Sequence, residues 1–377
     1  MTFILTFLGK GGVGCTTLAT AAARKYASAG KKVLLVTRDS VGVDAWGNIT
    51  PLGNNLDAIQ LQTSQLLETI WEKLKQLEAQ YLRSPLLKHI YGQELSIIPG
   101  MDDALALYFL REQYQSGNYD IIIYDGHSSL NTLRMFGLPD TLSWYLRRFQ
   151  NLLENSDIVK ALSPFVQPVS SAILNVTLTP ENITPQPVQD FSHILEEGKQ
   201  AIADSTRVCA FLVTDASVNA IAAAKYCWGG AQQVNLSVGG VLLNEGEKES
   251  SSLVAKIAGF VAGNYDRDNT LEQLRNEFKP LPVCLIRRNR ETIIEDLPDF
   301  QILAADAPKP LTINPVQREI RVFLPGFSKK EVKLSQSGPE ITISAGDQRR
   351  NIFLPPPLKG QPVKSAKFQD NYLIITL

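Results

Sequence analysis

Short runs of apolar residues recur between residues 2 and 286, and segments with helical spacing separate them. Such runs have no polar face to present to water, so they predict strands that are buried on both faces of a sheet. Because helices alternate with the runs, the strands should lie mostly parallel, with helices covering both sides. The chain is therefore predicted to contain an α/β domain built on a doubly wound, mostly parallel sheet. The expected strands are TFILTFL (2–8), KVLLVT (32–37), LSIIP (95–99), YDIIIYD (119–125), VCAFLVT (208–214), VGGVLLN (238–244) and PVCLI (282–286).

The first apolar run leads into a glycine-rich loop, GKGGVGCTT, which begins at Gly9. A loop between a strand and a helix points backbone N–H groups at one spot, and the helix N-terminus adds partial positive charge there. Loops that hold nucleotide phosphates usually read G-x-x-x-x-G-K-[ST], and Gly9, Gly14 and Thr16 fall in that register. Cys15 stands where the pattern has lysine, and a different lysine, Lys10, follows the first glycine.

The glycines of this loop let the backbone approach phosphate groups without a Cβ in the way. The hydroxyl of Thr16 would serve as a ligand of Mg²⁺. The alternative is a glycine turn that binds nothing, and the agreement of strand, spacing, threonine and helix argues against it. The expected nucleotide-binding residues are the whole loop: Gly9, Lys10, Gly11, Gly12, Val13, Gly14, Cys15, Thr16 and Thr17.

The balance of charges limits the classes of partner. The net charge is −1, from 37 basic and 38 acidic side chains, so the chain has no general attraction for nucleic acid or an anionic membrane. The four cysteines are far apart and only three histidines are present, so neither a zinc site nor a disulfide framework is expected, and the cytoplasm is the expected location. No apolar stretch approaches the roughly 18 residues of a membrane span, so stable membrane insertion is not expected.

Two insertions with helical spacing are expected in the α/β domain, at about residues 45–115 and 140–205. In the first, apolar residues between 56 and 90 fall on one face of a helix, and in the second those of 141–163 do the same. Residues 164–186 carry several prolines and predict a loop. Each apolar stripe is either intramolecular core or a surface for an apolar partner, and both alternatives stay open.

A change of pattern near residue 305 marks a second domain. Residues 305–315 read as a proline-bearing linker, and the segments after them alternate apolar and polar residues with turn residues between them. This alternation is typical of a small antiparallel β-sandwich. With 377 residues, the chain is long enough for such a division. The predicted domains are 1–304, with the linker at 305–315, and 316–377.

The segment KGGVGCTT is similar to the deviant phosphate loop K-G-G-x-G-K-[ST]-[ST] of the ArsA/Get-type ATPases, relatives of MinD and of the nitrogenase iron protein. The resemblance covers about residues 1–300. It implies ATP and Mg²⁺ as cofactors and a homodimer in which the early lysine reaches the partner's nucleotide. Lys10 matches that lysine.

Further segments carry the same resemblance. DGHSSLNTLRMFGLP is similar to the family's second switch, and its Asp125 matches the residue that holds Mg²⁺ through water. RDSVGVDA is similar to a shortened first switch and keeps Asp39, which would orient or activate the attacking water. VGGVLLNE is similar to the strand whose asparagine, here Asn244, reads the adenine edge. The second switch also retains, at matching offsets, Thr132, Leu133, Arg134, Leu138 and Pro139.

Cys15 removes the full positive charge that the usual lysine supplies. Losing such a group typically lowers a rate by about 10²–10³-fold, so ATP binding is better supported than ATP turnover. A cysteine at a helix N-terminus can become a reactive thiolate, but an anionic ligand beside it opposes that charge. We therefore expect a neutral thiol at Cys15 when nucleotide is present, and an ATPase activity that is weakened if it exists.

The last segment resembles the α-crystallin domain of small heat-shock proteins. The residues that fit that domain's pattern are Pro325, Gly326, Val332, Leu334, Ala366 and Leu373, whereas Tyr372 departs from it. The chain ends at Leu377 without the I-x-I tail that links protomers of those proteins, so a free-standing oligomeric chaperone is not expected. The domain either only packs against the ATPase domain or binds clients, and the sequence leaves both open.

Three functions follow from these resemblances. The favoured one is a homodimeric ATP-binding protein that binds or targets hydrophobic segments of membrane proteins under nucleotide control. The alternative is a nucleotide-binding scaffold or co-chaperone with little hydrolysis, which Cys15 and the shortened first switch favour. A metalloid- or anion-transport ATPase subunit is least expected, because soft ions need clustered cysteines and those of this chain are scattered.

Overall fold

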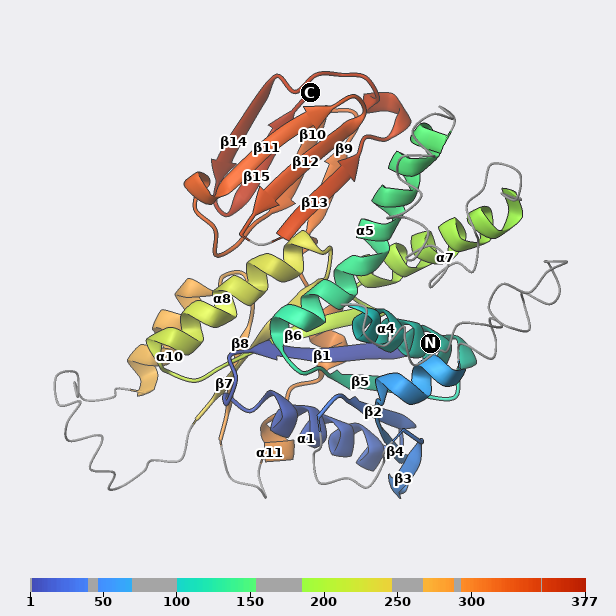
Figure 1. Ribbon diagram of the computed structural model, residues 1–377. Helices are drawn as coiled ribbons and strands as arrows, with labels where there is room; N and C mark the ends of the chain where they lie inside the picture. The colour runs from blue at the N-terminus through green and yellow to red at the C-terminus, as the bar shows by residue number, and fades with distance from the viewer. Residues whose placement is uncertain are drawn as a thin grey trace, which may run out of the picture.

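The computed structural model describes residues 2–39, 47–69, 100–153, 185–245, 267–287, 293–346 and 348–377. These residues form an α/β domain with a smaller antiparallel β domain stacked on it (Figure 1). The predicted fold class is confirmed in both parts. Within the described ranges, no helix combines the length and the apolarity that crossing a lipid bilayer requires.

The α/β domain is built on an 8-stranded sheet with the order β3-β4-β2-β5-β1-β6-β7-β8. Neighbouring strands are parallel except for β3 and β4, which pair antiparallel at one edge. The strands are β1 (Phe3–Gly9), β2 (Val33–Thr37), β3 (Thr50–Gly53), β4 (Leu56–Gln60), β5 (Ile121–Asp125), β6 (Val208–Thr214), β7 (Val238–Asn244) and β8 (Val283–Ile286).

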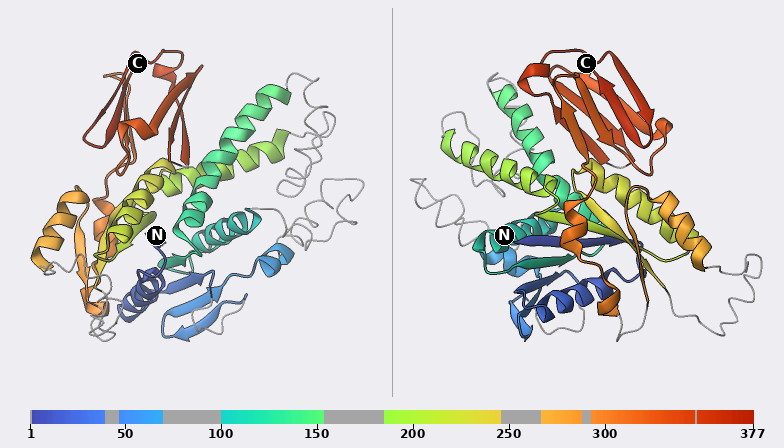
Figure 2. Two further views of the ribbon diagram at one scale, coloured as in Figure 1. Left: turned by 60° about the vertical axis from the view of Figure 1, so that its left-hand side comes forward. Right: turned by 180° about the vertical axis from the view of Figure 1, so that it is seen from behind.

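Helices cover both faces of this sheet, as the two views of Figure 2 show. One face carries α1 (Cys15–Ser28), α11 (Ile293–Asp296) and α12 (Phe300–Ala305). The other carries α4 (Met101–Ser116), α5 (Ser129–Leu153), α7 (Pro185–Ala203), α8 (Val218–Gln233) and α10 (Arg267–Glu277).

The central strand β1 has buried side chains on both of its faces. Its side chains alternate between the two faces, with Ile4 and Leu8 in one hydrophobic core and Phe3, Leu5 and Phe7 in the other. All five are buried. A strand covered by helices on both sides has to be apolar at odd and even positions alike, as the sequence predicted.

Two predicted elements differ from the structure. Residues 56–60 form β4, not the start of a long helix, because they pair in parallel with β2 and antiparallel with the edge strand β3. Tertiary pairing thus overrides local spacing. The helix expected over 141–163 begins earlier, at Ser129 of α5. The expected strand at 95–99 and most of the helical stripe after residue 69 lie outside the described residues.

The C-terminal domain is a sandwich of two antiparallel sheets with the orders β14-β15-β10-β9 and β11-β12-β13. Its strands β9 (Leu311–Asn314) and β10 (Glu319–Phe323) pair with each other, so one strand lies within the segment predicted as a linker. The remaining strands are β11 (Val332–Ser337), β12 (Glu340–Ala345), β13 (Gln348–Phe353), β14 (Ser365–Gln369) and β15 (Tyr372–Thr376). Inward-facing side chains such as Ile320, Ile343 and Ile375 fill its core.

The sandwich rests mainly on α8. The indole of Trp228 meets the ring of Phe323 edge to face, with centroids 5.4 Å apart, and Phe323 belongs to the core of the α/β domain. Gly229 allows this approach, since a Cβ there would lie 2.4 Å from the ring of Phe327. The two domains therefore share apolar core, and their arrangement is held by packing.

Candidate functional site

The sheet gathers the predicted functional residues along one edge. Four of these residues lie at or just after the carboxyl ends of parallel strands. Gly9 ends β1, Asp39 follows β2, Asp125 ends β5 and Asn244 ends β7. In open α/β sheets this is the edge at which ligands bind. The fold thus brings together side chains that are up to 235 positions apart in the sequence (Asn244 minus Gly9).

The glycine-rich loop has the backbone conformation of an anion-binding turn. Gly12 and Gly14 have φ values of 87° and 101°, in the left-handed region that favours glycine. A Cβ at Gly11 or Gly12 would meet no atom within 4 Å, so the space in front of them is open. Gly14 caps α1, whose first turn has neither an acidic residue nor a side-chain cap. The helix N-terminus therefore offers N–H groups and partial positive charge to an anion.

Asn244 supports the loop from β7. Its Nδ2 donates to the carbonyl oxygen of Val13 at 2.7 Å, and the side chain is 9% exposed. A Cβ at Gly14 would lie 2.5 Å from that nitrogen, so this glycine is required for the contact. The Oδ1 of Asn244 is buried without a hydrogen-bond partner. An orphaned acceptor of this kind fits a ligand that carries a donor, and the adenine-reading role of Asn244 stays a prediction.

Thr16 and Asp125 lie against each other, as a magnesium site requires. The Thr16 hydroxyl donates to the Asp125 carboxyl, which is 7% exposed. Burial raises the pKa of Asp125 to about 6, and Asp39 adds to the rise, whereas the Thr16 hydrogen bond and His127 oppose it. A divalent cation would reverse this balance by stabilising the carboxylate.

His127 forms a contact that sequence reasoning missed. Its Nδ1 lies 2.5 Å from Oδ1 of Asp39, and both side chains are accessible, at 44% and 61% exposure. The pair joins the loop after β2 to the loop after β5. The only sequence signal was the position of His127, two residues after Asp125 at a strand end. Its partner is 88 positions away, which no local pattern reveals.

Arg38 anchors the same corner. Its buried guanidinium donates to Oδ2 of Asp102 at 2.8 Å and to the Asp102 carbonyl at 2.9 Å, at the start of α4. Its backbone N–H donates to the carbonyl of Asp125 at 3.1 Å. Burial raises the pKa of the neighbouring Asp103, and Asp102 adds to that rise. Arg38 thus holds the ends of β2 and β5 and the start of α4 together, directly beside Asp39.

Cys15 is the first residue of α1, directly after Gly14, and its side chain is a neutral thiol. Burial raises its pKa to about 12, with further contributions from Asp125 and Cys227. At this position burial and the nearby carboxyl outweigh the helix N-terminus, which on its own would favour the thiolate. The thiol is therefore neutral at pH 7 even before the charge of any bound anion is considered.

The remaining predicted residues lie at the rim. Lys10, Thr16 and Thr17 are exposed, so the side chain of Lys10 is accessible to solvent. Ser129, which opens α5, locks the start of the loop, since its hydroxyl accepts from the Gly9 N–H and donates to the Gly9 carbonyl, both at 2.8 Å. Sequence reasoning did not single out this serine.

Comparisons with known proteins agree with this geometry. Residues 1–295 match the model of the anion-transporting ATPase family, and residues 316–377 match an HSP20-like domain found in ArsA. The chain belongs to this ATPase family, and its C-terminal domain is of the HSP20-like type, as the resemblances implied. It is an ArsA/Get-type protein by descent.

Individual relatives span different parts of the chain. A putative arsenical pump-driving ATPase of Chlorobaculum tepidum is 25% identical over 395 residues, covering 99% of this chain and 95% of the relative. The putative arsenical pump-driving ATPase 1 of Aquifex aeolicus is 22% identical and covers 99% of each. The ATPase get3 of Schizosaccharomyces japonicus is 32% identical over 154 residues, which are 38% of this chain and 46% of the relative.

Proposed function

We propose that this protein binds Mg-ATP at the glycine-rich loop as a homodimer and uses the nucleotide to control binding of hydrophobic protein segments. The observation that carries the proposal is the loop itself, with left-handed Gly12 and Gly14 leading into an uncapped helix beside the Thr16–Asp125 pair. Family membership supports nucleotide as the ligand.

We also propose that the chain divides into a domain of residues 1–304, a linker at 305–315 and a domain of residues 316–377, with β9 as a strand inside that linker.

The chain's own residues suit this ligand. Backbone N–H groups of the loop after Gly9, up to Thr17, would hold the phosphates, because the Gly9 N–H already donates to Ser129. Thr16 and Asp125 would hold Mg²⁺, the latter through water, and Asn244 would meet the base. Bound Mg-ATP supplies an electrophilic phosphorus and a divalent cation. Asp39 would orient the attacking water through Oδ2, because His127 already contacts its Oδ1. His127 is in this account a positioning residue.

Lys10 is proposed to act on the nucleotide of the partner subunit. Its exposure at the rim supports this role, and the neutral thiol of Cys15 leaves the loop without the usual cation. The same neutrality favours the alternative, a nucleotide-binding scaffold or co-chaperone with little hydrolysis. An ion-pump role for soft metalloids is less supported, because Cys209 is buried in β6, Cys227 in α8, and Cys284 lies in β8.

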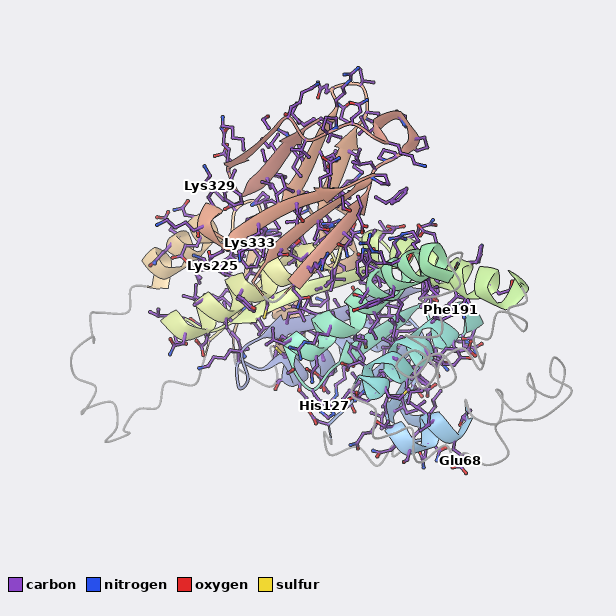
Figure 3. All side chains as sticks on the ribbon, turned by 45° about the horizontal axis from the view of Figure 1, so that its top comes forward. Glu68, His127, Phe191, Lys225, Lys329 and Lys333 are labelled. Atoms are coloured by element: carbon purple, nitrogen blue, oxygen red, sulfur yellow. The ribbon has the colours of Figure 1, made fainter. Side chains whose placement is uncertain are left out.

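The test compares ATP affinity and steady-state phosphate release for the wild type, Cys15→Lys and Lys10→Ala. We expect Cys15→Lys to raise turnover by about 10²-fold, since it restores a full charge at the phosphates. Lys10→Ala should weaken binding and turnover, whereas Lys333→Ala, an exposed lysine of the β-sandwich labelled in Figure 3, should change neither. If Cys15→Lys gains no activity and Lys10→Ala loses no binding, the account of the loop is wrong.

A mixing experiment tests whether Lys10 acts across the dimer. Lys10→Ala and Asp39→Asn subunits should each be inactive alone. In a mixed dimer, the Lys10→Ala subunit keeps its own Asp39 and receives Lys10 from its partner. Random mixing should therefore restore about a quarter of wild-type turnover, because half of the dimers are mixed and each has one complete site. No restoration would place Lys10 within its own subunit's site.

Client binding separates the favoured function from the scaffold. A fluorescent amphipathic helical peptide should bind the dimer in Mg-ATP and dissociate when the nucleotide is removed. Analytical ultracentrifugation in the same buffers would follow dimer formation. If the peptide binds equally well with and without nucleotide, and the protein still binds ATP, the scaffold function is supported.

A further inference from the structure

A cavity lies away from the phosphate loop, where the two domains meet. It has a volume of about 350 Å³ and is lined by residues of α5, α7, the end of α8, β9 and β13. This volume is within the usual range of small-ligand sites, roughly 300–1,000 Å³. In Figure 1 these elements meet beneath the β-sandwich, on the side of α5.

One wall of the cavity contains an unpartnered amide. The side chain of Gln233, at the end of α8, is 2% exposed, and both its Nε2 and its Oε1 lack a hydrogen-bond partner. A buried amide without partners is costly, so such groups normally meet another polar group or an ordered water. The amide of the preceding residue, Gln232, is also buried without partners, but Gln232 does not line the cavity. An occupant that both accepts and donates a hydrogen bond would satisfy the amide of Gln233.

The charges around the cavity favour an anion. Arg147, Lys199 and Arg350 line it together with Asp140 and Glu196, which leaves three cations against two carboxylates. Lys199 lies 2.9 Å from Glu196 and 3.9 Å from Asp140. Arg350 donates instead to neutral oxygens, the Gln232 carbonyl at 2.8 Å and Asn235 Oδ1 at 2.5 Å.

Arg147 makes neutral contacts as well. Its Nη1 donates to the Ser143 hydroxyl at 2.7 Å, and its guanidinium lies 5.7 Å from the ring centre of Phe353. Burial raises the pKa of Asp140, whereas Lys199, Arg350 and Arg147 oppose the rise.

The remaining walls are apolar and come from both domains. Phe136 and Ile202 belong to the α/β domain, and Ile313 and Phe353 to the β-sandwich. An inorganic anion would satisfy the cations but would leave these side chains against water. Water alone could pair with Gln233, but it would leave the excess positive charge unmatched.

We propose that this cavity binds an organic carboxylate with an apolar body and an N–H group next to the carboxylate, the chemistry of an N-acylated apolar amino acid. The carboxylate would meet Lys199, Arg147 and Gln233 Nε2, the N–H would meet Gln233 Oε1, and the body would meet the apolar walls. The same chemistry occurs in a free small molecule and in the last residue of an apolar polypeptide. Because the walls come from both domains, the ligand joins them.

Calorimetric titration of the full-length protein with N-acetyl-leucine tests the site. We expect one ligand per chain, and weaker binding of N-acetyl-leucine amide, which lacks the carboxylate. Gln233→Leu should weaken binding about tenfold, because it removes both hydrogen bonds, and it should fold at least as well as the wild type, since it removes one buried unpaired amide. Lys199→Met, at a partly exposed position, should weaken it to a similar degree.

Lys329→Met is the matched control. Lys329 is an exposed lysine of the β-sandwich, labelled in Figure 3, and it does not line the cavity, so this variant should bind as the wild type does. No binding of N-acetyl-leucine, equal binding by Gln233→Leu, or equal affinity for the amide would each overturn the proposal and leave a water-filled cavity. A short peptide ending in leucine distinguishes the sources, because tighter binding than N-acetyl-leucine indicates a polypeptide end and weaker binding a free small molecule.

Discussion

The phosphate loop and the junction between the domains differ in whether their polar groups already have hydrogen-bond partners. At the loop, the space in front of Gly11 and Gly12 is open, and the N-terminus of α1 is uncapped. At the junction, the guanidinium of Arg350 is 4% exposed and donates to Gln232, Asn235 and Pro310. The N–H groups of the loop are open to a ligand, whereas the guanidinium of Arg350 at the junction already has partners. The side-chain amides of Gln232 and Gln233 and the Nε1 of Trp228 are buried at the junction without partners.

Helix α8 belongs to both regions. It follows β6, whose Val213 pairs with Gly9 at the end of β1, so it begins near the sheet edge that carries the loop. The carbonyl of Gln232 in its last turn accepts a hydrogen bond from Arg350, and Trp228, one turn earlier, packs against the ring of Phe323. The comparison therefore predicts that substitutions at the junction alter stability, whereas most substitutions at the loop alter ligand binding.

The largest expected effect on stability is that of Arg350→Ala. Removing the guanidinium leaves buried oxygens unpaired and opens a cavity, and the free energy of unfolding should fall by about 3 kcal/mol. Burial lowers the pKa of Arg350 to about 10, so the charge is present at pH 7 and its desolvation offsets part of the loss. Urea unfolding would be followed at both domains, which need not unfold together.

The neighbouring arginine is the control for this experiment. Arg349 is exposed and lies over the ring of Trp144, at 5.3 Å from its centre. Arg349→Ala should cost no more than about 1 kcal/mol. Equal effects of the two substitutions would show that buried hydrogen bonds do not hold the junction.

A smaller effect, of opposite sign, is expected for Asp125→Asn in the absence of Mg²⁺ and nucleotide. The pKa of Asp125 rises from 3.8 to about 6 on folding because burial disfavours the carboxylate. The folded protein then binds the proton more tightly than the unfolded chain, so the free energy of unfolding falls as the pH rises between these values and is level above them. Asn has no such loss, and the variant should be more stable by about 2 kcal/mol at pH 7.

Thermal unfolding of both proteins across this pH range measures the difference. The two curves should meet below the unfolded pKa and separate as the pH approaches about 6. The same substitution should abolish Mg²⁺-dependent ATP binding, so stability and function move in opposite directions. Curves that remain parallel at all pH values would contradict the assignment of the raised pKa to Asp125.

The smallest expected effect separates two glycines of one loop. Gly14→Ala places a Cβ at φ 101°, 2.5 Å from the amide nitrogen of Asn244, and should destabilise the protein by about 1–2 kcal/mol. Gly11→Ala meets no atom within 4 Å and should leave stability within about 0.5 kcal/mol of the wild type. Its Cβ projects into the proposed phosphate space, so ATP affinity should fall. An unchanged melting temperature for Gly14→Ala would contradict the described loop conformation.

Much of the α/β domain could be predicted because its signals are local. Six of the apolar runs are strands in the structure, namely β1, β2, β5, β6, β7 and β8. All but β8 are buried as predicted, whereas β8 lies at the sheet edge and is mostly half-buried. The strand β4 was missed, since Leu56–Gln60 contains Asp57 and Gln60 and is a strand through its pairing with β2. A strand of this kind, which lies between β2 and the edge strand β3, has no purely local pattern.

The candidate site was predictable in part for the same reason. The loop from Gly9 to Thr17 is contiguous, and Asp39, Asp125 and Asn244 each follow an apolar run, so strand ends indicated them. His127 and Arg38 were missed, because their roles depend on Asp39 and Asp102, which are 88 and 64 positions away. Cys15 shows the same limit, since its neutral state depends on burial and on Asp125.

The sequence by itself determined the strand pattern, the glycine conformations of the loop and the presence of a second, antiparallel domain. These features depend on backbone sterics and on hydrophobic periodicity, which act over a few residues. Only the tertiary structure decided that His127 meets Asp39, that Arg350 is buried under the sandwich and that Gln233 lines a cavity between two domains. Burial and long-range pairing are properties of the packed chain, because the same side chains would be hydrated in the unfolded chain.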